Sequence, residues 1–243
     1  MHLMSVLRLC LAKLEQLAGW LNPMVWVEEA NIARCVLGLV FGGSLILTAE
    51  PLGAGGRNKA DDRWLPLFNG RDLSGWKTHP DDRARWYIWD GILVGSGPTG
   101  HLFTERGDYR NFRFRIEAKI SKKGNSGQYF RATFSNGFPP GYEAQINSDS
   151  EDPIRTGSLY PDQLSSDDER EAIVIRSQLI KPDEWFTQEV IAMGNHIIIK
   201  LNGATTVDFV DRRWRFAKGH FAFQQHHDGS VIMIRKAEVK ELP

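Results

Sequence analysis

Three short stretches of the sequence place polar, chemically active side chains at alternate positions. The pairs are Tyr129 and Arg131, Glu143 and Gln145, and Gln224 and His226. Alternate residues of a β-strand point to the same face, so each pair would present its two side chains together. A carboxylate among tyrosines can have its pKa raised toward neutrality, which suits a general base. Guanidinium, amide and imidazole groups beside it could stabilise an oxyanion or donate a proton.

The elements that would carry these residues are predicted to be strands. From Trp64 onward, short alternating stretches are separated by Gly, Pro, Asn and Asp, and no long helical period appears. We expect strands at 111–120, 127–133 and 142–147, a hairpin of 196–201 with 205–209 around Asn202-Gly203, a closing pair of 220–226 with 231–239, and a short helix at 169–176. So many short strands predict an all-β sandwich or jelly roll, with the polar pairs on one open sheet face.

Composition limits the function classes. The 243 residues include 30 basic and 30 acidic side chains, so a neutral chain gives no electrostatic reason to expect nucleic-acid binding. Eight Trp, five Tyr and thirteen Phe could pack in a core or stack on sugars. For Trp76, Trp86 and Trp89 the core is the expected place. Cys10 and Cys35 are the only cysteines, so the predicted sandwich contains no disulfide.

The N-terminal quarter differs from the rest. Residues 1–34 are interpreted as an extension, either helical or untranslated, and residues 50–63 as a Gly-rich linker before the domain at 64–243. Between them, residues 35–49 (CVLGLVFGGSLILTA) form an uncharged apolar run after Arg34. That pattern favours a signal or a membrane anchor, with a buried helix as the alternative, and hence an extracytoplasmic protein.

Several motifs in order resemble the 3-keto-disaccharide hydrolase family, a concanavalin-like jelly roll. They are LFNGRDLSGW (67–76), WDGIL (89–93), NSGQYFR (125–131), GYEAQI (141–146), TGSLY (156–160) and QQH (224–226). Each motif alone is weak, but the ordered set covers roughly 180 residues, about 64–242. The chain departs from the family at Arg235-Lys236, where an Arg-Asn pair is usual, and in the charged loop 160–181, so the exact substrate does not carry over.

The resemblance implies cleavage of glycosides whose sugar carries a ketone at carbon 3. Glu143 would remove the acidic proton on carbon 2, and Arg131 with Gln145 would bind the enolate oxygen. Tyr160 or His226 would protonate the leaving oxygen. Sugar hydroxyls would contact a further polar set, consisting of Asn125, Tyr129, Gln145 and Gln224.

Structural interpretations stand beside these roles. Glu143 and Arg131 could form a cross-strand ion pair, and His226 could be a hydrogen-bonded structural histidine. Asn125-Ser126-Gly127 is expected mainly to form a turn that sets the following strand.

A divalent metal ion would assist the elimination by polarising the ketone. The sequence offers His226-His227-Asp228, or oxygen ligands for calcium from Asp149, Glu151 and Asp152. Adjacent strand residues point to opposite faces, which argues against joint ligation by the two histidines.

Two other functions compete with the keto-glycoside enzyme. The first is a non-catalytic carbohydrate-binding module, because the same sandwich supports lectin-like binding. The second is an ordinary glycoside hydrolase, which needs a second carboxylate opposite Glu143, for example from 149–152. The sequence contains no dinucleotide-binding fingerprint, so a separate oxidoreductase would have to make the ketone.

Overall fold

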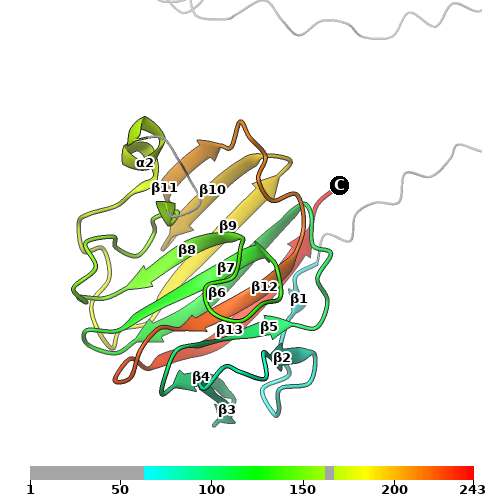
Figure 1. The fold of residues 1–243 in the computed structure, drawn as a ribbon, viewed down its shortest axis with the longest axis vertical. Helices are drawn as coiled ribbons and strands as arrows, with labels where there is room; N and C mark the ends of the chain where they lie inside the picture. The colour runs from blue at the N-terminus through cyan, green and yellow to red at the C-terminus, as the bar shows by residue number, and fades with distance from the viewer. Residues whose placement is uncertain (1–62, 162–166) are drawn as a thin grey trace, which may run out of the picture. The chain divides into compact units, whose positions relative to one another are not determined.

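The computed structural model describes residues 63–161 and 167–243. These residues form two antiparallel sheets packed face to face (Figure 1). One sheet has the order β11-β10-β9-β6-β13-β4-β3, with β1 paired to β13, and the other has the order β2-β5-β12-β7-β8. The strands are β1 Leu65–Pro66, β2 Trp76–Thr78, β3 Arg85–Trp89, β4 Ile92–Ser96, β5 Gly100–Thr104, β6 Phe112–Ile120, β7 Asn125–Ala132, β8 Tyr142–Asn147, β9 Phe186–Met193, β10 His196–Leu201, β11 Ala204–Val210, β12 His220–Gln225 and β13 Ile232–Glu241. One short helix is described, α2 at Asp167–Ile173. The predicted all-β sandwich is confirmed.

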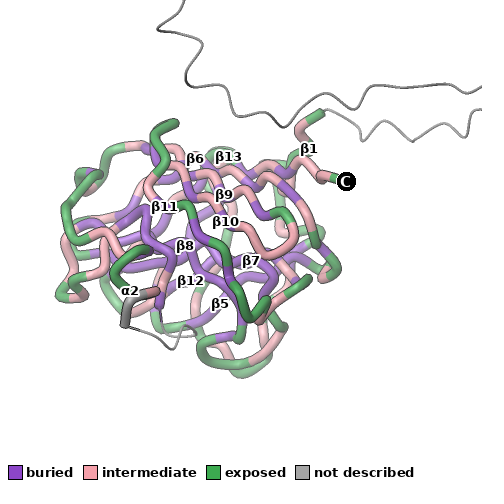
Figure 2. Tube along the Cα trace, turned by 90° about the horizontal axis from the view of Figure 1, so that it is seen from above, coloured by how far each residue is buried: buried purple, intermediate pink, exposed green. Residues whose placement is uncertain are grey.

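The core lies between the two layers. Figure 2 shows the two layers of strands, with buried residues along the strands of both. Strand β6 alternates buried and half-buried residues along its whole length, because its apolar side chains face the second sheet. Phe221 of β12 stacks on Phe114 with ring centroids 4.1 Å apart and meets Phe112 edge-on at 4.7 Å. Aromatic packing of this kind fixes β12 against β6.

Strands β7 and β8 are buried on both faces, unlike β6. Their inner face carries core residues such as Phe130 and Ile146, whereas their outer face carries Glu143, Gln145 and Asn125. The sequence suggested that this outer face would be open to solvent. Its polar side chains are instead buried.

Most predicted elements are confirmed, with two corrections. The residues 220–226 and 231–239 do not pair with each other, because β12 pairs with β5 and β7 while β13 belongs to the opposite sheet. Asn125-Ser126-Gly127 is not a turn, since all three residues lie in β7 opposite β8.

The tryptophans follow the core interpretation only in part. Trp76 is buried and Trp86 packs against the core, but Trp89 is 61% exposed on β3. None of the three lines the cavity described below.

Three predicted segments lie outside the described residues: the extension 1–34, the apolar segment 35–49 and most of the linker 50–63. Within the described residues, no helix has the length and apolar character that a membrane span requires.

Candidate functional site

A cavity of about 110 Å³ lies on the outer face of the five-stranded sheet. Strands β7, β8 and β12 form its floor, and the segments after β7 and β8 form its sides. Seven of its lining residues are among those predicted from the sequence, namely Asn125, Tyr129, Glu143, Gln145, Tyr160, Gln224 and His226. We call it the Glu143 cavity.

Strand register explains why these side chains meet. Tyr129 lies opposite Glu143, and Gly127 lies opposite Gln145, in the antiparallel pair of β7 and β8. From β12, the Nε2 atom of Gln224 donates a hydrogen bond to the Tyr129 hydroxyl at 3.3 Å. Side chains opposite each other on one face stand close together, so three strands contribute to a single polar surface.

Glu143 occupies space that Gly127 leaves free. A Cβ atom at position 127 would lie 2.1 Å from Glu143 Oε1 and 2.7 Å from its Cδ. Glu143 as a whole is only 8% exposed. The glycine in the middle of β7 therefore allows the carboxylate to lie flat over the strand, a use of glycine for close approach.

A second carboxylate lines the same cavity. Asp152 accepts hydrogen bonds at Oδ2 from the Tyr160 hydroxyl at 3.2 Å and from Gln145 Nε2 at 3.3 Å. Its Oδ1 accepts the backbone N–H of Ile154 at 2.8 Å. Asp152 thus holds the two side chains that flank Glu143.

Several buried polar atoms at the site have no hydrogen-bond partner among the described residues. They include Asn125 Oδ1 and Gln224 Oε1, both on residues that line the cavity. A buried acceptor without a partner costs about 1–3 kcal/mol, so native proteins contain few of them. Amide oxygens on residues that line a cavity are suited to accept hydrogen bonds from the hydroxyl groups of a ligand once the side chains turn toward it.

His226 lines the cavity, and His101 packs against the lining residues Tyr129 and Phe138. Burial lowers the pKa of His101 to about 4, and the nearby His226 contributes to the shift. Burial and then His227 lower the pKa of His226, while Asp152 opposes them. Both rings are therefore neutral near pH 7. The Nδ1 atoms of His226 and His227 are 3.1 Å apart, since β12 ends at Gln225 and releases the strand alternation.

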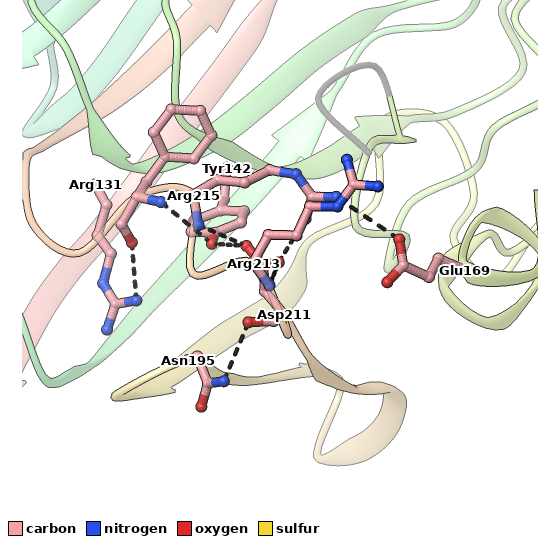
Figure 3. A network of polar contacts seen from close by, with 8 residues as sticks. Arg131, Tyr142, Glu169, Asn195, Asp211, Arg213 and Arg215 are labelled. Atoms are coloured by element: carbon pink, nitrogen blue, oxygen red, sulfur yellow. Dashed lines mark hydrogen bonds and ion pairs between the residues drawn. The ribbon is translucent and has the colours of Figure 1, made fainter. Parts of the chain in front are cut away.

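Arg131 is the one predicted site residue that lies elsewhere. Its backbone φ is 51°, and the pairing of β7 with β12 shifts by one residue at this position, which is a β-bulge. The guanidinium donates through two N–H groups to the carbonyl oxygen of Arg110, at 2.9 and 2.6 Å. A third N–H donates to the carbonyl oxygen of Phe216 at 3.1 Å, which is the contact of Arg131 drawn in Figure 3. It also lies 5.9 Å from the core ring of Phe112.

The bulge therefore turns Arg131 away from the face of Tyr129 and Glu143. The prediction that Arg131 binds a ketone oxygen is wrong, and so is the alternative of an ion pair across that face. Arg131 instead ties backbone segments together from a position that is 1% exposed.

Four lining residues were not predicted as site residues: Phe138, Pro139, Gly141 and Asp152. Three come from the loop SNGFPPG, which reads as a turn because of its glycines and prolines. An exposed Phe inside such a loop is the signal that could have been noticed, since Phe138 is 62% exposed. The sequence suggests Asp152 only as a calcium ligand or as a second carboxylate opposite Glu143.

The predicted metal ligands do not gather. In 63–161 and 167–243, no three His, Cys, Asp or Glu side chains lie close enough together to hold a metal ion.

Comparison with known proteins gives the family. The family described as the 3-keto-alpha-glucoside-1,2-lyase-like domain matches residues 63–240. A 3-keto-disaccharide hydrolase of Bacteroides thetaiotaomicron is 33% identical over 81 residues, which are 29% of this chain and 28% of that protein. The chain thus matches less than a third of the length of this relative.

Solved structures share the fold. A candidate glycosyl hydrolase from Parabacteroides distasonis has a TM-score of 0.60 at 24% identity, covering 74% of this chain and 94% of that one. The metal-free carbohydrate recognition domain of Emp46p has a TM-score of 0.52 at 13% identity, covering 74% and 100%. At such identities the likeness concerns the fold alone. The match over 63–240 shows that this chain belongs to the 3-keto-alpha-glucoside-1,2-lyase-like domain family.

Proposed function

We propose that this protein cleaves 3-keto-glycosides by elimination, with Glu143 as the general base. The observation that carries the proposal is the carboxylate of Glu143, held over Gly127 in a cavity with unpaired carbonyl acceptors. A ketone at carbon 3 acidifies the proton on carbon 2, so a positioned carboxylate can remove it. Family membership supports the same chemistry.

The proton moves from carbon 2 to the Glu143 carboxylate, and charge develops on the ketone oxygen. The bond from carbon 1 to the leaving oxygen then breaks, giving an unsaturated ketone and an alcohol. Gln145 replaces Arg131 as the proposed enolate ligand, because its amide lies in the cavity. Tyr160 is the proposed acid for the leaving oxygen, since the lowered pKa of His226 leaves that ring without an extra proton near pH 7. Addition of water to carbon 1, with return of the proton to carbon 2, would complete a hydrolysis.

Replacing Glu143 tests the proposal. We expect Glu143→Gln to reduce cleavage of a 3-keto-glycoside by about 10²- to 10⁴-fold, the range for a general base. Thermal unfolding should show that the variant remains folded. Near-normal turnover would contradict the role of Glu143. The ketone would come from a separate oxidoreductase, so the unoxidised glycoside should not react.

A second function is favoured by one specific observation. Asp152 lines the same cavity as Glu143, and two carboxylates across a site are what an ordinary glycoside hydrolase requires. Cleavage of an unoxidised glycoside, abolished by Asp152→Asn as well as by Glu143→Gln, would favour this function. Binding of both sugars without turnover would instead indicate a carbohydrate-binding module.

The extracytoplasmic location remains part of the proposal. It depends on the apolar segment 35–49. Fractionation of cells that express the full chain, with and without this segment, would test it.

A further inference from the structure

Strand β3 is a border strand of the larger sheet, and no strand of the described chain lies beyond it (Figure 1). The opposite border of this sheet is β11, beside which helix α2 packs. In the other sheet, segment 157–160 bonds to the backbone of the border strand β8, and the border strand β2 has only three residues. An uncovered border strand can pair with another chain, so proteins normally shield it. Strand β3 is therefore the border best suited to association.

The turn after β3 determines which way the backbone groups of the strand point. Asp90 and Gly91 both have positive φ, at 50° and 75°, and join β3 to β4 as a two-residue turn of type I′. Such a turn closes on a hydrogen-bonded pair, so Trp89 and every second residue before it bond to β4 through the backbone. The N–H and C=O groups of Trp86 and Ile88 therefore point away from β4, toward the uncovered border.

The side chains of β3 form two rows. Arg85, Tyr87 and Trp89 form the outer row and are all exposed, Tyr87 at 47% and Trp89 at 61%. Trp86 and Ile88 form the inner row, where they pack against the core and remain partly exposed. Exposed aromatic side chains beside partly exposed apolar ones are typical of a surface that binds another protein.

We infer that β3 pairs antiparallel with β3 of a second copy of this chain, about a two-fold axis at Tyr87. In that register Tyr87 lies opposite itself, and Arg85 lies opposite Trp89. Trp86 lies opposite Ile88, and their outward backbone groups bond across the axis, because they form the hydrogen-bonded pairs on either side of it. A two-fold interface must be self-complementary, and the order Arg-Trp-Tyr-Ile-Trp meets that condition.

Charge supports a second copy as the partner. In the outer row, the guanidinium of Arg85 would lie over the ring of Trp89 in the other copy, a cation–π contact. The protein already uses this contact on the same sheet, where the guanidinium carbon of Arg115 in β6 lies 3.8 Å from the ring centroid of Trp64. Each copy supplies both the cation and the ring, so the strand is complementary to itself.

The pairing goes beyond the proposed function and does not depend on it. Strand β3 belongs to the larger sheet, whereas the Glu143 cavity lies on the outer face of the other sheet. Substitutions in β3 should therefore change the association of the chain and leave KM at that cavity unchanged.

Cysteine cross-linking tests the register in the full chain, with Cys10 and Cys35 first replaced by serine. Opposite residues in a pair without hydrogen bonds have Cα atoms about 4.5 Å apart, within the range of a disulfide. We therefore expect Tyr87→Cys to form a disulfide-linked dimer under mild oxidation. Arg85→Cys alone should give less than about a tenth as much, because the two copies of position 85 lie four residues out of register, about 14 Å apart.

A mixture of Arg85→Cys and Trp89→Cys chains should cross-link again, because the register places these two positions opposite each other. The pairing would be overturned if Tyr87→Cys gave no disulfide-linked dimer, or if Arg85→Cys alone gave as much.

Charge at the axis gives a second test, by analytical ultracentrifugation of the full chain. Tyr87→Glu and Tyr87→Lys each place like charges opposite each other, so each should weaken dimerisation about tenfold or more. An equal mixture of the two variants places opposite charges there and should dimerise again. Thr205→Glu is the matched control, because Thr205 is exposed on the covered border strand β11, and it should leave the dimer unchanged.

Two results would overturn the pairing. Variants at Tyr87 that dimerise as the wild type does would exclude β3 as the interface. A wild-type chain that stays monomeric would exclude a second copy as the partner and leave the border of β3 to an extended segment of another protein.

Discussion

Two groups of buried polar side chains in this protein differ in how they are satisfied. Around Asp211, both carboxylate oxygens accept hydrogen bonds (Figure 3). Oδ2 accepts from the Tyr142 hydroxyl at 2.5 Å and the Arg215 N–H at 2.9 Å, and Oδ1 from the Arg213 N–H at 3.0 Å. Around the Glu143 cavity, atoms of Asn125, Gln224 and His101 have no partner in the described chain.

In the Asp211 group, Nη2 of Arg215 also has no hydrogen bond among the described residues, but it lies 3.7 Å from Glu169 Oε2, an ion pair within the protein. The contrast indicates a structural role for the first group and a ligand-binding role for the second. The Asp211 group joins β8 to the segment after β11, and its bonds stabilise that connection without a ligand. The cavity group leaves acceptors unpaired at a cost in stability, which a ligand with hydroxyl groups would recover. Substitutions in the first group should therefore change mainly the free energy of unfolding, and substitutions of the residues that line the cavity mainly catalysis.

The largest effect is expected at Asp211. Asp211→Asn should lower the free energy of unfolding by about 3–5 kcal/mol, because it breaks a fully buried, charged hydrogen-bond group. Asp208→Asn is the control, since Asp208 is exposed and pairs with His196 at the surface, where about 1 kcal/mol or less is expected. Chemical denaturation measures both values. KM should not change in the folded fraction of Asp211→Asn. If Asp211→Asn lowered the free energy of unfolding by less than about 1 kcal/mol, the Asp211 group would not have the structural role given to it here.

The second prediction concerns the pH dependence of stability, through the buried ring of His101. Its pKa is about 4 in the folded protein against an ordinary 6.5, so the unfolded chain binds more protons between these values. Stability should therefore fall as pH falls from 6.5 to 4, by about 3 kcal/mol from this residue. His101→Phe, in a site already lined by Phe103, Tyr129 and Phe138, should lose that much less over the same window.

Urea denaturation at several pH values gives the comparison. Parallel curves for His101→Phe and the wild type would contradict the assignment.

Strand alternation was sufficient to predict most of the site. It placed Glu143 with Gln145, because β8 is a regular strand through that pair. Gln224 and His226 also line the cavity together, although β12 ends between them. Strand alternation failed at Arg131, where one extra residue in β7 reverses the period, and the sequence of β7 shows no mark of the bulge.

The cavity residues that lie in loops were also not predicted from the sequence. Phe138 and Asp152 enter the cavity from segments whose course depends on tertiary contacts, so the sequence alone does not show that they meet Glu143, even where Phe138 stands out in a Gly- and Pro-rich loop. Pairing of β12 with β5 and β7 rather than β13 was missed for the same reason.

Gly127→Ala tests whether the position of the Glu143 carboxylate affects the rate and not the stability. The new Cβ would displace the carboxylate, and a misplacement of about 1 Å can cost about 10²-fold in rate. Stability should change little, because the displaced atoms belong to a flexible side chain. In the Glu143→Gln background, Gly127→Ala should have no further effect on kcat, and this double-mutant cycle separates positioning from general damage. Additive losses would show that Gly127 acts independently of Glu143.

Phe138 should give the smallest effect and the most selective one. Its side chain is 62% exposed, so Phe138→Ala should change the free energy of unfolding by no more than about 0.5 kcal/mol. The ring lines the cavity, and an aromatic contact worth about 0.5–1.5 kcal/mol predicts a KM about two- to tenfold higher for the keto sugar. Trp89→Ala is the matched control, because Trp89 is 61% exposed and does not line the Glu143 cavity. A rise in KM with Trp89→Ala and none with Phe138→Ala would place the sugar on β3 and away from Glu143, and the contrast between the two buried polar groups would then lose its functional meaning.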